Sequence, residues 1–324
     1  MADELHVIFG GGQVGQPLAR ILGKRGLRVR MVKRSAGAPD GIELKQGDAT
    51  DPDFCREAAR GASTVYHCMN PPYSARIWAD VIPKYIDNLI AAAGSSGARL
   101  VVLQSVYMLG RTGGRPMNED TPLNPCSRKG EIRAREVERL FEAHRRGEVR
   151  ATAGRASDYY GPGATLSHLG DQFWKPVIAG GRGRVLVNPD AIHTYHYVPD
   201  VAEGLATLGT ASDDAYGKPW MLPCSPAASM RALVARFSRY LGRDIGLTVM
   251  PRWGVRSLGL IVPMIGEINE MLYQWDEPFI IDDRRFRKAF AAEPIEVERA
   301  AADTVAWAKE HYASPKLEQA QTGR

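Results

Sequence analysis

Cysteine is scarce in this sequence, and the few cysteines are not paired. Four are spread over 324 residues, and none belongs to a C-x-x-C pair. This spacing indicates neither a zinc site nor a disulfide framework. His193 and His196 are three residues apart, but no cysteine or glutamate pattern accompanies them, so we interpret both as strand residues. We predict no metal site and expect a reduced compartment.

Long hydrophobic runs are also missing. The most apolar stretch, Leu258 to Ile265, is too short to cross a bilayer and contains Pro263. An apolar run begins already at Leu5, with no secretion signal before it. We therefore expect a cytoplasmic protein without a membrane partner.

Neither sign of charge dominates the chain. Its 42 Lys and Arg and 37 Asp and Glu leave a formal charge of +5. The densest basic stretch, Arg128 to Arg146, is interleaved with glutamates, as expected of a solvated helix with ion pairs. No nucleic-acid partner is predicted. The mild positive charge favours anionic cofactors or substrates.

The run Leu5–Phe9 has the length of a strand and leads directly into glycines. Gly10, Gly12 and Gly15 follow in the order G-x-G-x-x-G, and helical spacing follows them. Between a strand and a helix of a strand–helix–strand unit, this pattern is typical of a dinucleotide-binding turn. A flexible glycine turn in an ordinary α/β domain is the alternative.

Each glycine has a separate expected task. Gly10 allows the tight turn, Gly12 lets the backbone approach a diphosphate, and Gly15 lets helix and strand pack closely. Free N–H groups at the helix start favour an anion. We predict that these glycines, with Gln13 and Val14 between them, bind a dinucleotide cofactor.

The second strand, near residues 27–32, ends without an acidic residue. NAD-binding turns place a carboxylate about 20 residues beyond the glycines. Lys33, Arg34 and Ser35 occupy that place, and the next carboxylate is Asp40. Two cations and a hydroxyl suit a 2′-phosphate. We predict NADP(H) as the cofactor and leave NAD(H) open; a solvated basic strand end is the alternative.

Two further segments fit the same domain. Asp48 could accept a hydrogen bond from the adenine amino group, although Asp is also common in turns. Residues 64–70 form a buried-type strand that stops at Pro71 and Pro72. Because open parallel sheets bind ligands at the carboxyl ends of their strands, residues after this strand should face the cofactor.

The segments taken in order resemble the extended short-chain dehydrogenase/reductase family, which holds NAD-dependent epimerases and dehydratases, and are closer to its atypical branch. The resemblance runs from about residue 5 to 310. The motifs that carry it are the glycine turn, Gly47-Asp48, residues 105–110, 119–122, Tyr160-Gly161-Pro162-Gly163 and Val198-Pro199-Asp200-Val201.

The resemblance implies an α/β fold: a Rossmann-type doubly wound parallel sheet with a small C-terminal substrate-binding lobe. We expect a dinucleotide-binding domain over 1–165 with a returning segment near 194–212. The substrate lobe should take mainly 166–193 and 213–314, and 315–324 should be a disordered tail.

The family's catalytic set is a serine or threonine, a tyrosine, and a lysine four residues after the tyrosine. Ser105 matches the hydroxyl position, where it would hydrogen-bond the substrate oxygen. Lys129 and Arg133 stand where the tyrosine and the lysine are expected. Arg133 can still bond the nicotinamide ribose, but it cannot exchange protons near neutral pH.

Three alternatives remain for the proton transfer. Lys129, which we also count among the cofactor contacts, could replace the tyrosine, because free lysine and tyrosine have pKa values of about 10.4 and about 10 and nearby cations would lower the pKa of Lys129. Tyr107 could supply a phenol from the other side of the pocket, with Tyr73 and Tyr160 as weaker candidates. Lastly, the site could only bind a dinucleotide, as a redox sensor.

We predict an NADP(H)-dependent oxidoreductase that acts on a carbonyl or secondary alcohol of a small molecule. The aromatic and methionine residues of the expected lobe favour an apolar or aromatic substrate. The alternative enzyme is an epimerase, dehydratase or lyase that oxidises its substrate transiently. The sequence is compatible with a homodimer but does not predict one.

Overall fold

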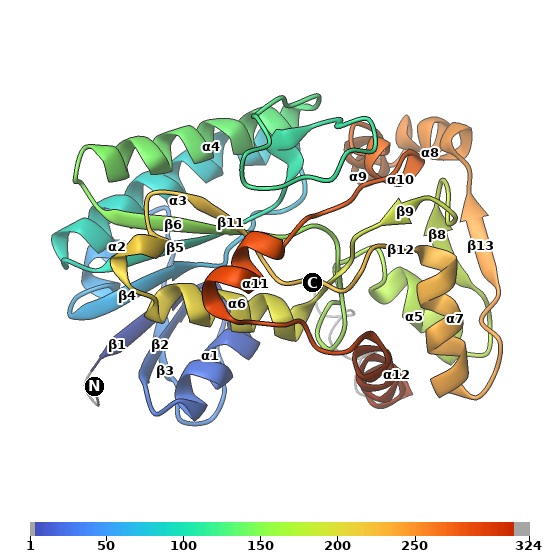
Figure 1. The fold of residues 1–324 in the computed structure, drawn as a ribbon, viewed down its shortest axis with the longest axis horizontal. Helices are drawn as coiled ribbons and strands as arrows, with labels where there is room; N and C mark the ends of the chain where they lie inside the picture. The colour runs from blue at the N-terminus through green and yellow to red at the C-terminus, as the bar shows by residue number, and fades with distance from the viewer. Residues whose placement is uncertain (1–3, 314–324) are drawn as a thin grey trace.

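The centre of the molecule is a seven-stranded sheet, in which every neighbouring pair is parallel and the order is β11-β6-β5-β4-β1-β2-β3 (Figure 1). The computed structural model describes residues 4–313, so the tail predicted at 315–324 lies outside them. The strands are β1 (Leu5–Phe9), β2 (Arg28–Lys33), β3 (Glu43–Gln46), β4 (Ala62–His67), β5 (Arg99–Gln104), β6 (Arg150–Arg155) and β11 (Pro219–Met221). The predicted doubly wound parallel fold is confirmed.

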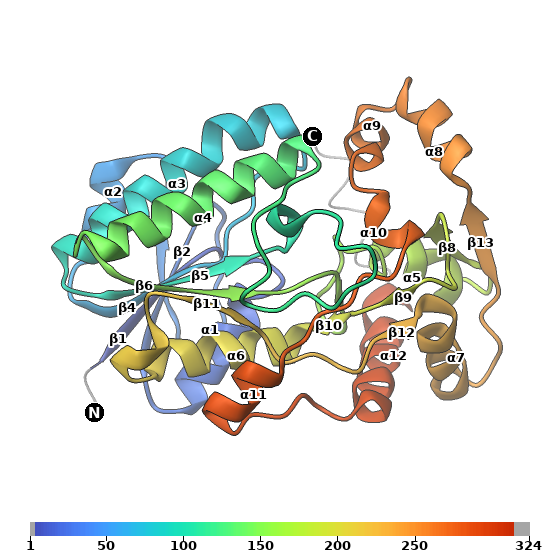
Figure 2. The same ribbon diagram turned by 45° about the horizontal axis from the view of Figure 1, so that its top comes forward.

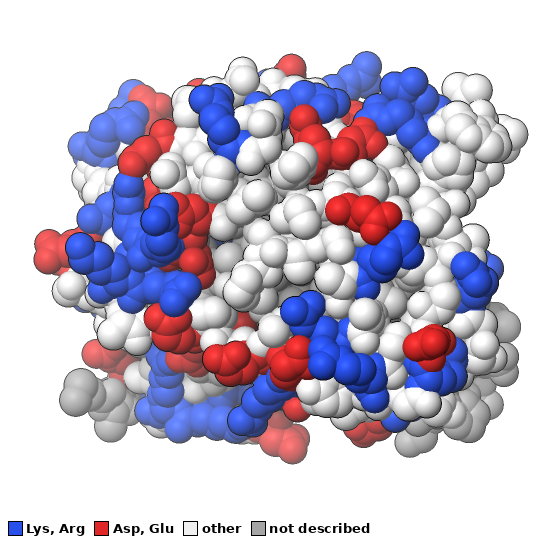
Figure 3. Space-filling view, turned by 45° about the vertical axis from the view of Figure 1, so that its right-hand side comes forward, with Lys and Arg blue, Asp and Glu red and all other residues white. Residues whose placement is uncertain are grey.

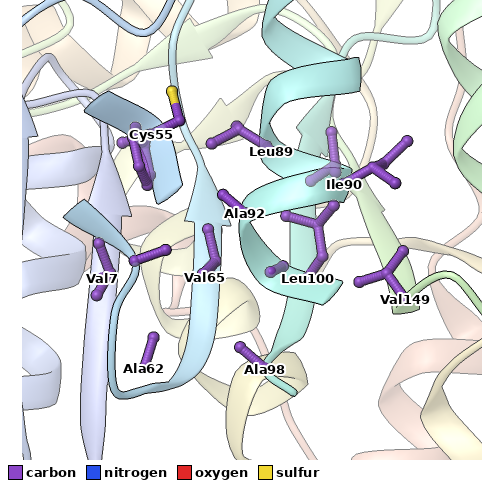
Figure 4. Close-up of a cluster of buried hydrophobic side chains, with 14 of the residues drawn as sticks. Val7, Cys55, Ala62, Val65, Leu89, Ile90, Ala92, Ala98, Leu100 and Val149 are labelled. Atoms are coloured by element: carbon purple, nitrogen blue, oxygen red, sulfur yellow. The ribbon is translucent and has the colours of Figure 1, made fainter. Parts of the chain in front are cut away.

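Helices cover both faces of this sheet. One face carries α1 (Gly15–Lys24) and α6 (Val198–Thr210), and the other carries α2 (Pro52–Ala58), α3 (Ala75–Ser95) and α4 (Arg128–Arg145) (Figure 1). Because both faces are covered, all five residues of β1 are buried rather than every second one. Figure 4 shows part of the core on the second of these faces, in which Val7, Val65 and Leu100 of the sheet meet Leu89 and Ile90 of α3.

The C-terminal lobe is smaller and mostly helical. Its core lies where Phe173 and Trp174 of α5 meet Phe237 of α7. Its elements are α5 (Asp171–Ile178), β8 (Gly183–Leu186), β12 (Ala228–Ser229), α7 (Met230–Leu241), β13 (Leu247–Met250), α8 (Arg252–Gly259), α9 (Pro263–Asn269), α10 (Tyr273–Asp276) and α12 (Val297–Ala313). Strands β8 and β13 pair in parallel at its edge.

Six short elements lie between the longer ones; all but η2, which joins α6 to β11, lie where the sheet and the lobe meet or beside β11. They are η1 (Tyr107–Leu109), β7 (Tyr159–Tyr160), β9 (Ile192–His193), β10 (His196–Tyr197), η2 (Asp213–Ala215) and α11 (Arg284–Phe290). β7 pairs with β10, and β9 pairs with β12 of the lobe. Both His193 and His196 therefore belong to strands, as predicted.

The strands of the sheet point their carboxyl ends toward the lobe (Figure 2). Residues that follow β1, β4, β5 and β6 therefore come together where the two parts meet, the place where open parallel sheets bind ligands. Over one face of the molecule, lysine and arginine are interspersed with aspartate and glutamate (Figure 3). Within residues 4–313, no helix combines the length and the apolar character needed to span a membrane.

The conspicuous apolar residues of the lobe do not form one pocket. Trp174 belongs to the lobe core, and Met271, Tyr273 and Phe279 pack against η1. The side chains of Trp253 and Met264, by contrast, are 72% and 62% exposed.

Candidate functional site

The glycine turn between β1 and α1 is held by close backbone contacts. Gly10 has φ +112°, and a Cβ added there would lie 2.7 Å from the carbonyl carbon of Cys68. A Cβ on Gly15 would overlap the carbonyl oxygen of Gly10. Neither position therefore accepts a side chain, which fits the predicted tight turn and close helix packing.

Gly12 differs from these two glycines, because a Cβ added there would meet no atom within 4 Å. Its missing side chain leaves open space in front of the start of α1. Val14, the N-cap residue, makes no side-chain capping hydrogen bond, and the first N–H groups of a helix have no partner within it. Such a cradle fits the diphosphate of a dinucleotide.

Lys33, the last residue of β2, lies beside this turn. The side chain of Lys33 crosses Gly11 so closely that a Cβ on Gly11 would come 2.6 Å from Lys33 Cδ. Arg34 and Ser35 are exposed. The positions are those expected for contacts to a 2′-phosphate, and that role stays a prediction.

Asp48 forms a local turn. Its Oδ1 accepts hydrogen bonds from the N–H and the Oγ1–H of Thr50, each at 2.9 Å. The carboxylate is exposed, so the second oxygen is available for an adenine amino group, as predicted but not tested.

Lys129, at the family's tyrosine position, is completely buried in the first turn of α4. Its Nζ donates to the carbonyl oxygen of Glu267 at 3.0 Å, to Glu267 Oε2, and to Glu270 Oε1 at 2.8 Å. The ammonium also lies 4.6 Å from the ring centre of Tyr73. Since a lysine ammonium has three N–H donors, all of them have partners here.

The same two glutamates of the α9 region bind the starts of two helices. Glu267 Oε2 accepts from the N–H of Ala75 in α3 at 2.9 Å, and Glu270 Oε2 accepts from the N–H of Arg128 in α4 at 2.9 Å. Carboxylates are favoured at helix N-termini. Lys129 is therefore part of an ionic contact that ties the lobe to the sheet domain.

Arg133, at the family's lysine position, is buried and held in place. It donates to Glu136 Oε2 at 2.7 Å and to Asn70 Oδ1 at 2.8 Å, and its guanidinium lies 4.8 Å from the ring centre of Trp78. Its Nε has no hydrogen-bond partner among the described residues. Asn70 follows β4, so Arg133 reaches the sheet edge where a nicotinamide ribose is expected.

Ser105 directly follows β5, and its Oγ is buried without a hydrogen-bond partner in the described part of the chain. Tyr107 lies two residues further on, stacked on Trp78 with ring centres 6.2 Å apart. Burial raises the pKa of Tyr107 to about 12, with Asp158 contributing, while hydrogen bonds to Tyr73 and Gln274 oppose the rise. At neutral pH this phenol keeps its proton.

The remaining tyrosine candidates are less suited to chemistry. Burial raises the pKa of Tyr73 well above its usual range, and the ring packs edge-on against Trp78. Tyr160 is buried in the lobe core, where its hydroxyl pairs with Ser225 Oγ at 3.2 Å.

Sequence reasoning missed a polar group around Asp158, which follows β6. Its Oδ2 accepts from Trp275 Nε1–H at 2.7 Å and lies 3.2 Å from His193 Nε2. The Asp158 side chain is 14% exposed. Asp158 precedes the Tyr160-Gly161-Pro162-Gly163 motif by two residues, a position that could have marked it as a site residue.

Comparisons with known proteins agree with this fold. The family model described as the NAD dependent epimerase/dehydratase family matches residues 6–219. The comparison with curated proteins gave no match.

Three solved structures illustrate the similarity of the fold. UDP-glucuronic acid 4-epimerase from Bacillus cereus in complex with NAD is 12% identical, with TM-score 0.76, over 95% of this chain and 99% of that chain. The dTDP-glucose 4,6-dehydratase DesIV from Streptomyces venezuelae with NAD and TYD bound is 16% identical, with TM-score 0.76, over 95% and 98%. UDP-N-acetylglucosamine 4-epimerase from Bacillus cereus is 13% identical, with TM-score 0.74, over 94% and 96%.

Proposed function

The chain belongs to the NAD dependent epimerase/dehydratase family, and we propose that it is an NADP(H)-dependent oxidoreductase that acts on a carbonyl or secondary alcohol of a small molecule. One observation carries the proposal: the unpartnered hydroxyl of Ser105 and the phenol of Tyr107 follow the same strand end. A hydroxyl that orients the substrate oxygen and a phenol that exchanges its proton are what such a reaction needs.

Residues of this chain suit the diphosphate and the nicotinamide ribose of the dinucleotide cofactor. Gly10, Gly12 and Gly15 would hold the diphosphate at the start of α1, and Arg133 would bond the nicotinamide ribose. When bound, the dinucleotide supplies hydride exchange at C4 of its nicotinamide ring. The chain itself has to orient the substrate oxygen and to move a proton.

The proton is assigned to Tyr107 rather than Lys129. All three N–H donors of Lys129 already have acceptors, so none is left for a substrate oxygen. Tyr107 keeps its proton at neutral pH because burial raises its pKa to about 12. A protonated phenol two residues after Ser105 suits carbonyl reduction, in which the oxygen gains a proton.

The preference for NADP(H) rests on Lys33, beside the glycine turn, and on the exposed Arg34 that follows it. Arg34→Asp should weaken NADPH binding about tenfold or more while changing NADH binding much less, because a charge-assisted contact to a 2′-phosphate is lost. Isothermal titration calorimetry with both nucleotides measures this. Lys24→Asp makes the same charge change at the far end of α1 and should alter neither affinity; equal losses of both nucleotides in Arg34→Asp would refute the phosphate contact.

An epimerase or dehydratase with transient oxidation is the second candidate. It is supported by the family and by the UDP-sugar epimerases and the dehydratase that share the fold. The two candidates differ in cofactor balance. An oxidoreductase consumes NADPH in proportion to the carbonyl compound reduced, whereas an epimerase or dehydratase forms product with no net change in NADPH absorbance.

A further inference from the structure

The turn between α8 and α9 carries a group of exposed apolar side chains. Leu260 and Ile261 in the turn are 89% and 80% exposed, and Trp253 of α8 and Met264 of α9 are also more than half exposed. Within residues 4–313, Leu166 is the one other large apolar side chain that is more than half exposed. Exposed apolar groups of this kind mark surfaces that a partner or a membrane covers. The four residues are called the apolar tip below.

The two helices hold the apolar tip in a defined shape. They pack through glycines, since a Cβ added to Gly266 would lie 2.8 Å from the carbonyl oxygen of Gly259. The N–H of Val262 donates to the carbonyl oxygen of Leu258 at 2.8 Å, and Val255 on the inner side of α8 is fully buried. The turn projects at the outer edge of the molecule (Figure 2), so the larger side chains of the tip face outward.

This helix pair is also positively charged. Residues 252–266 contain two arginines and no acidic residue. Arg252 pairs with Asp276, whereas Arg256 is exposed and has no ion pair with a described residue. Burial and the positive charges of Arg256 and Arg111 lower the pKa of Arg252. Cations therefore gather beside the apolar tip.

The acidic residues that follow the tip are used on its inner side. Glu267 and Glu270 both bind the buried ammonium of Lys129. They also accept from the N–H groups of Ala75 and Arg128, at the starts of two helices of the sheet domain. The outer side of α8 and α9 therefore combines apolar side chains with unbalanced positive charge.

We propose that the apolar tip docks on the surface of a membrane that contains anionic phospholipids. Leu260 and Ile261 would enter the boundary between headgroups and acyl chains, and Trp253 would lie at the level of the headgroups. Arg256 would bind lipid phosphate. The protein would lie on the membrane without spanning it, a case that the sequence-based expectation of no membrane partner did not consider.

Charge complementarity favours lipid over a second copy of this chain. In a symmetric dimer the same patch meets itself, so Arg256 would face its own counterpart. Like charges across an interface oppose association. An anionic lipid surface instead attracts the arginine and buries the apolar side chains in the same contact.

Docking is tested by co-sedimentation of the full-length protein with vesicles. Vesicles of phosphatidylglycerol and phosphatidylcholine in equal parts should bind it, and high salt should weaken this binding. Vesicles of phosphatidylcholine alone should bind about fivefold more weakly or less, because the attraction between anionic headgroups and arginine is lost. No binding to the anionic vesicles, or equal binding to both kinds, overturns the proposal.

Substitution of the two most exposed residues tests the apolar contact. The double variant Leu260→Ser/Ile261→Ser should lower the vesicle partition coefficient about tenfold or more, since binding scales with the apolar area that enters the lipid. Leu166→Ser is the matched control, because Leu166 is as exposed as Leu260 but lies between β7 and α5. It should bind like the wild type. A double variant that also binds like the wild type overturns the proposal.

The charge contact has its own pair of variants. Arg256→Gln should lower binding to the anionic vesicles about fivefold. Arg60→Gln removes another exposed arginine, just before β4 and at the edge of the sheet that points away from the lobe, and should leave binding unchanged. Equal losses in the two variants overturn the contact of Arg256 with lipid.

Self-association through the tip is the competing result. Sedimentation velocity without vesicles should give the same oligomeric state for the wild type and for Leu260→Ser/Ile261→Ser. A wild-type oligomer that dissociates in the double variant shows that a second copy covers the tip, and overturns the proposal. These experiments use neither substrate nor nucleotide, so their outcome is independent of the proposed oxidoreductase function.

Discussion

The glycine turn after β1 and the first turn of α4 are built in opposite ways. At the glycine turn, side chains are absent, the space beside Gly12 is open, and the start of α1 has no side-chain cap. At α4, the Ser127 hydroxyl caps the N–H of Gly130, and Glu270 accepts from the N–H of Arg128. One helix start leaves donors for a ligand, and the other uses its donors inside the protein.

We interpret the glycine turn as a binding site and the start of α4 as an anchor between the lobe and the sheet domain. An uncapped helix start with open space in front of it can take an anion, whereas the charges around Lys129 are already balanced. In this chain, the position of the family's tyrosine has become a contact between lobe and sheet. We therefore propose that the chemistry falls to groups at the end of a neighbouring strand, Ser105 and Tyr107 after β5.

Removing the Tyr107 hydroxyl should have the largest effect. Tyr107→Phe should reduce turnover of the best carbonyl substrate about 10³-fold, because a positioned proton donor is lost, with nucleotide affinity and Tm unchanged because the ring still stacks on Trp78. Lys129→Arg keeps the charge but cannot exchange protons near neutral pH, and it should keep turnover. Steady-state kinetics measure both; an active Tyr107→Phe with an inactive Lys129→Arg would reverse the assignment.

The start of α6 offers a third case, a buried carboxyl at a helix N-terminus. Asp200 accepts from the N–H of Ile295 at 3.0 Å, and burial raises its pKa from 3.8 to about 7. Between about pH 4 and pH 7, folding therefore takes up a proton. The stabilisation that Asp200 gains from this proton is complete below about pH 4 and is lost as the pH rises through about 7. Asp200→Asn should remove a penalty of about 4 kcal/mol at pH 8.

Urea unfolding at pH 8 and pH 5 measures this difference. The gain in unfolding free energy for Asp200→Asn should be large at pH 8 and much smaller at pH 5. A gain that is equal at both pH values would show that Asp200 is not protonated on folding.

Lys129→Met tests the anchoring role directly. It leaves Glu267 and Glu270 without their shared cation, and breaking a buried pair should lower the unfolding free energy by about 3 kcal/mol. Lys175→Met is the control, because its ion pair with Asp171 is partly exposed and should contribute about 0.5 kcal/mol. Similar losses in both variants, measured by urea unfolding, would show that Lys129 does not anchor the lobe.

The two helix starts also differ in how far the sequence predicts them. The glycine turn is local: strand, glycines and helix lie within residues 5–24, so spacing alone indicates its geometry. The start of α4 could be predicted as a helix, but the partners of Lys129 lie 138 and 141 residues away. Side chains so distant in sequence meet only through the packing of the lobe.

Asp158 and His193 escaped prediction for the same reason. His193 was correctly interpreted as a strand residue, yet its pairing with Asp158 across 35 positions and with Gln274 across 81 depends on how β9 and α10 pack. The spacing of His193 and His196 also does not reveal their different neighbours, which are Asp158 and Gln274 for His193 and Ser157 and Leu222 for His196.

Calorimetric titration of NADPH into wild-type protein and Gly12→Ala tests the central claim, that the open cradle at α1 binds a dinucleotide diphosphate. The added methyl group would touch no protein atom, so the variant should keep the wild-type Tm. Its NADPH affinity should fall about tenfold, because the methyl group would enter the space of the diphosphate. Unchanged affinity in Gly12→Ala, or no heat from wild-type protein with NADPH or NADH, would contradict the account.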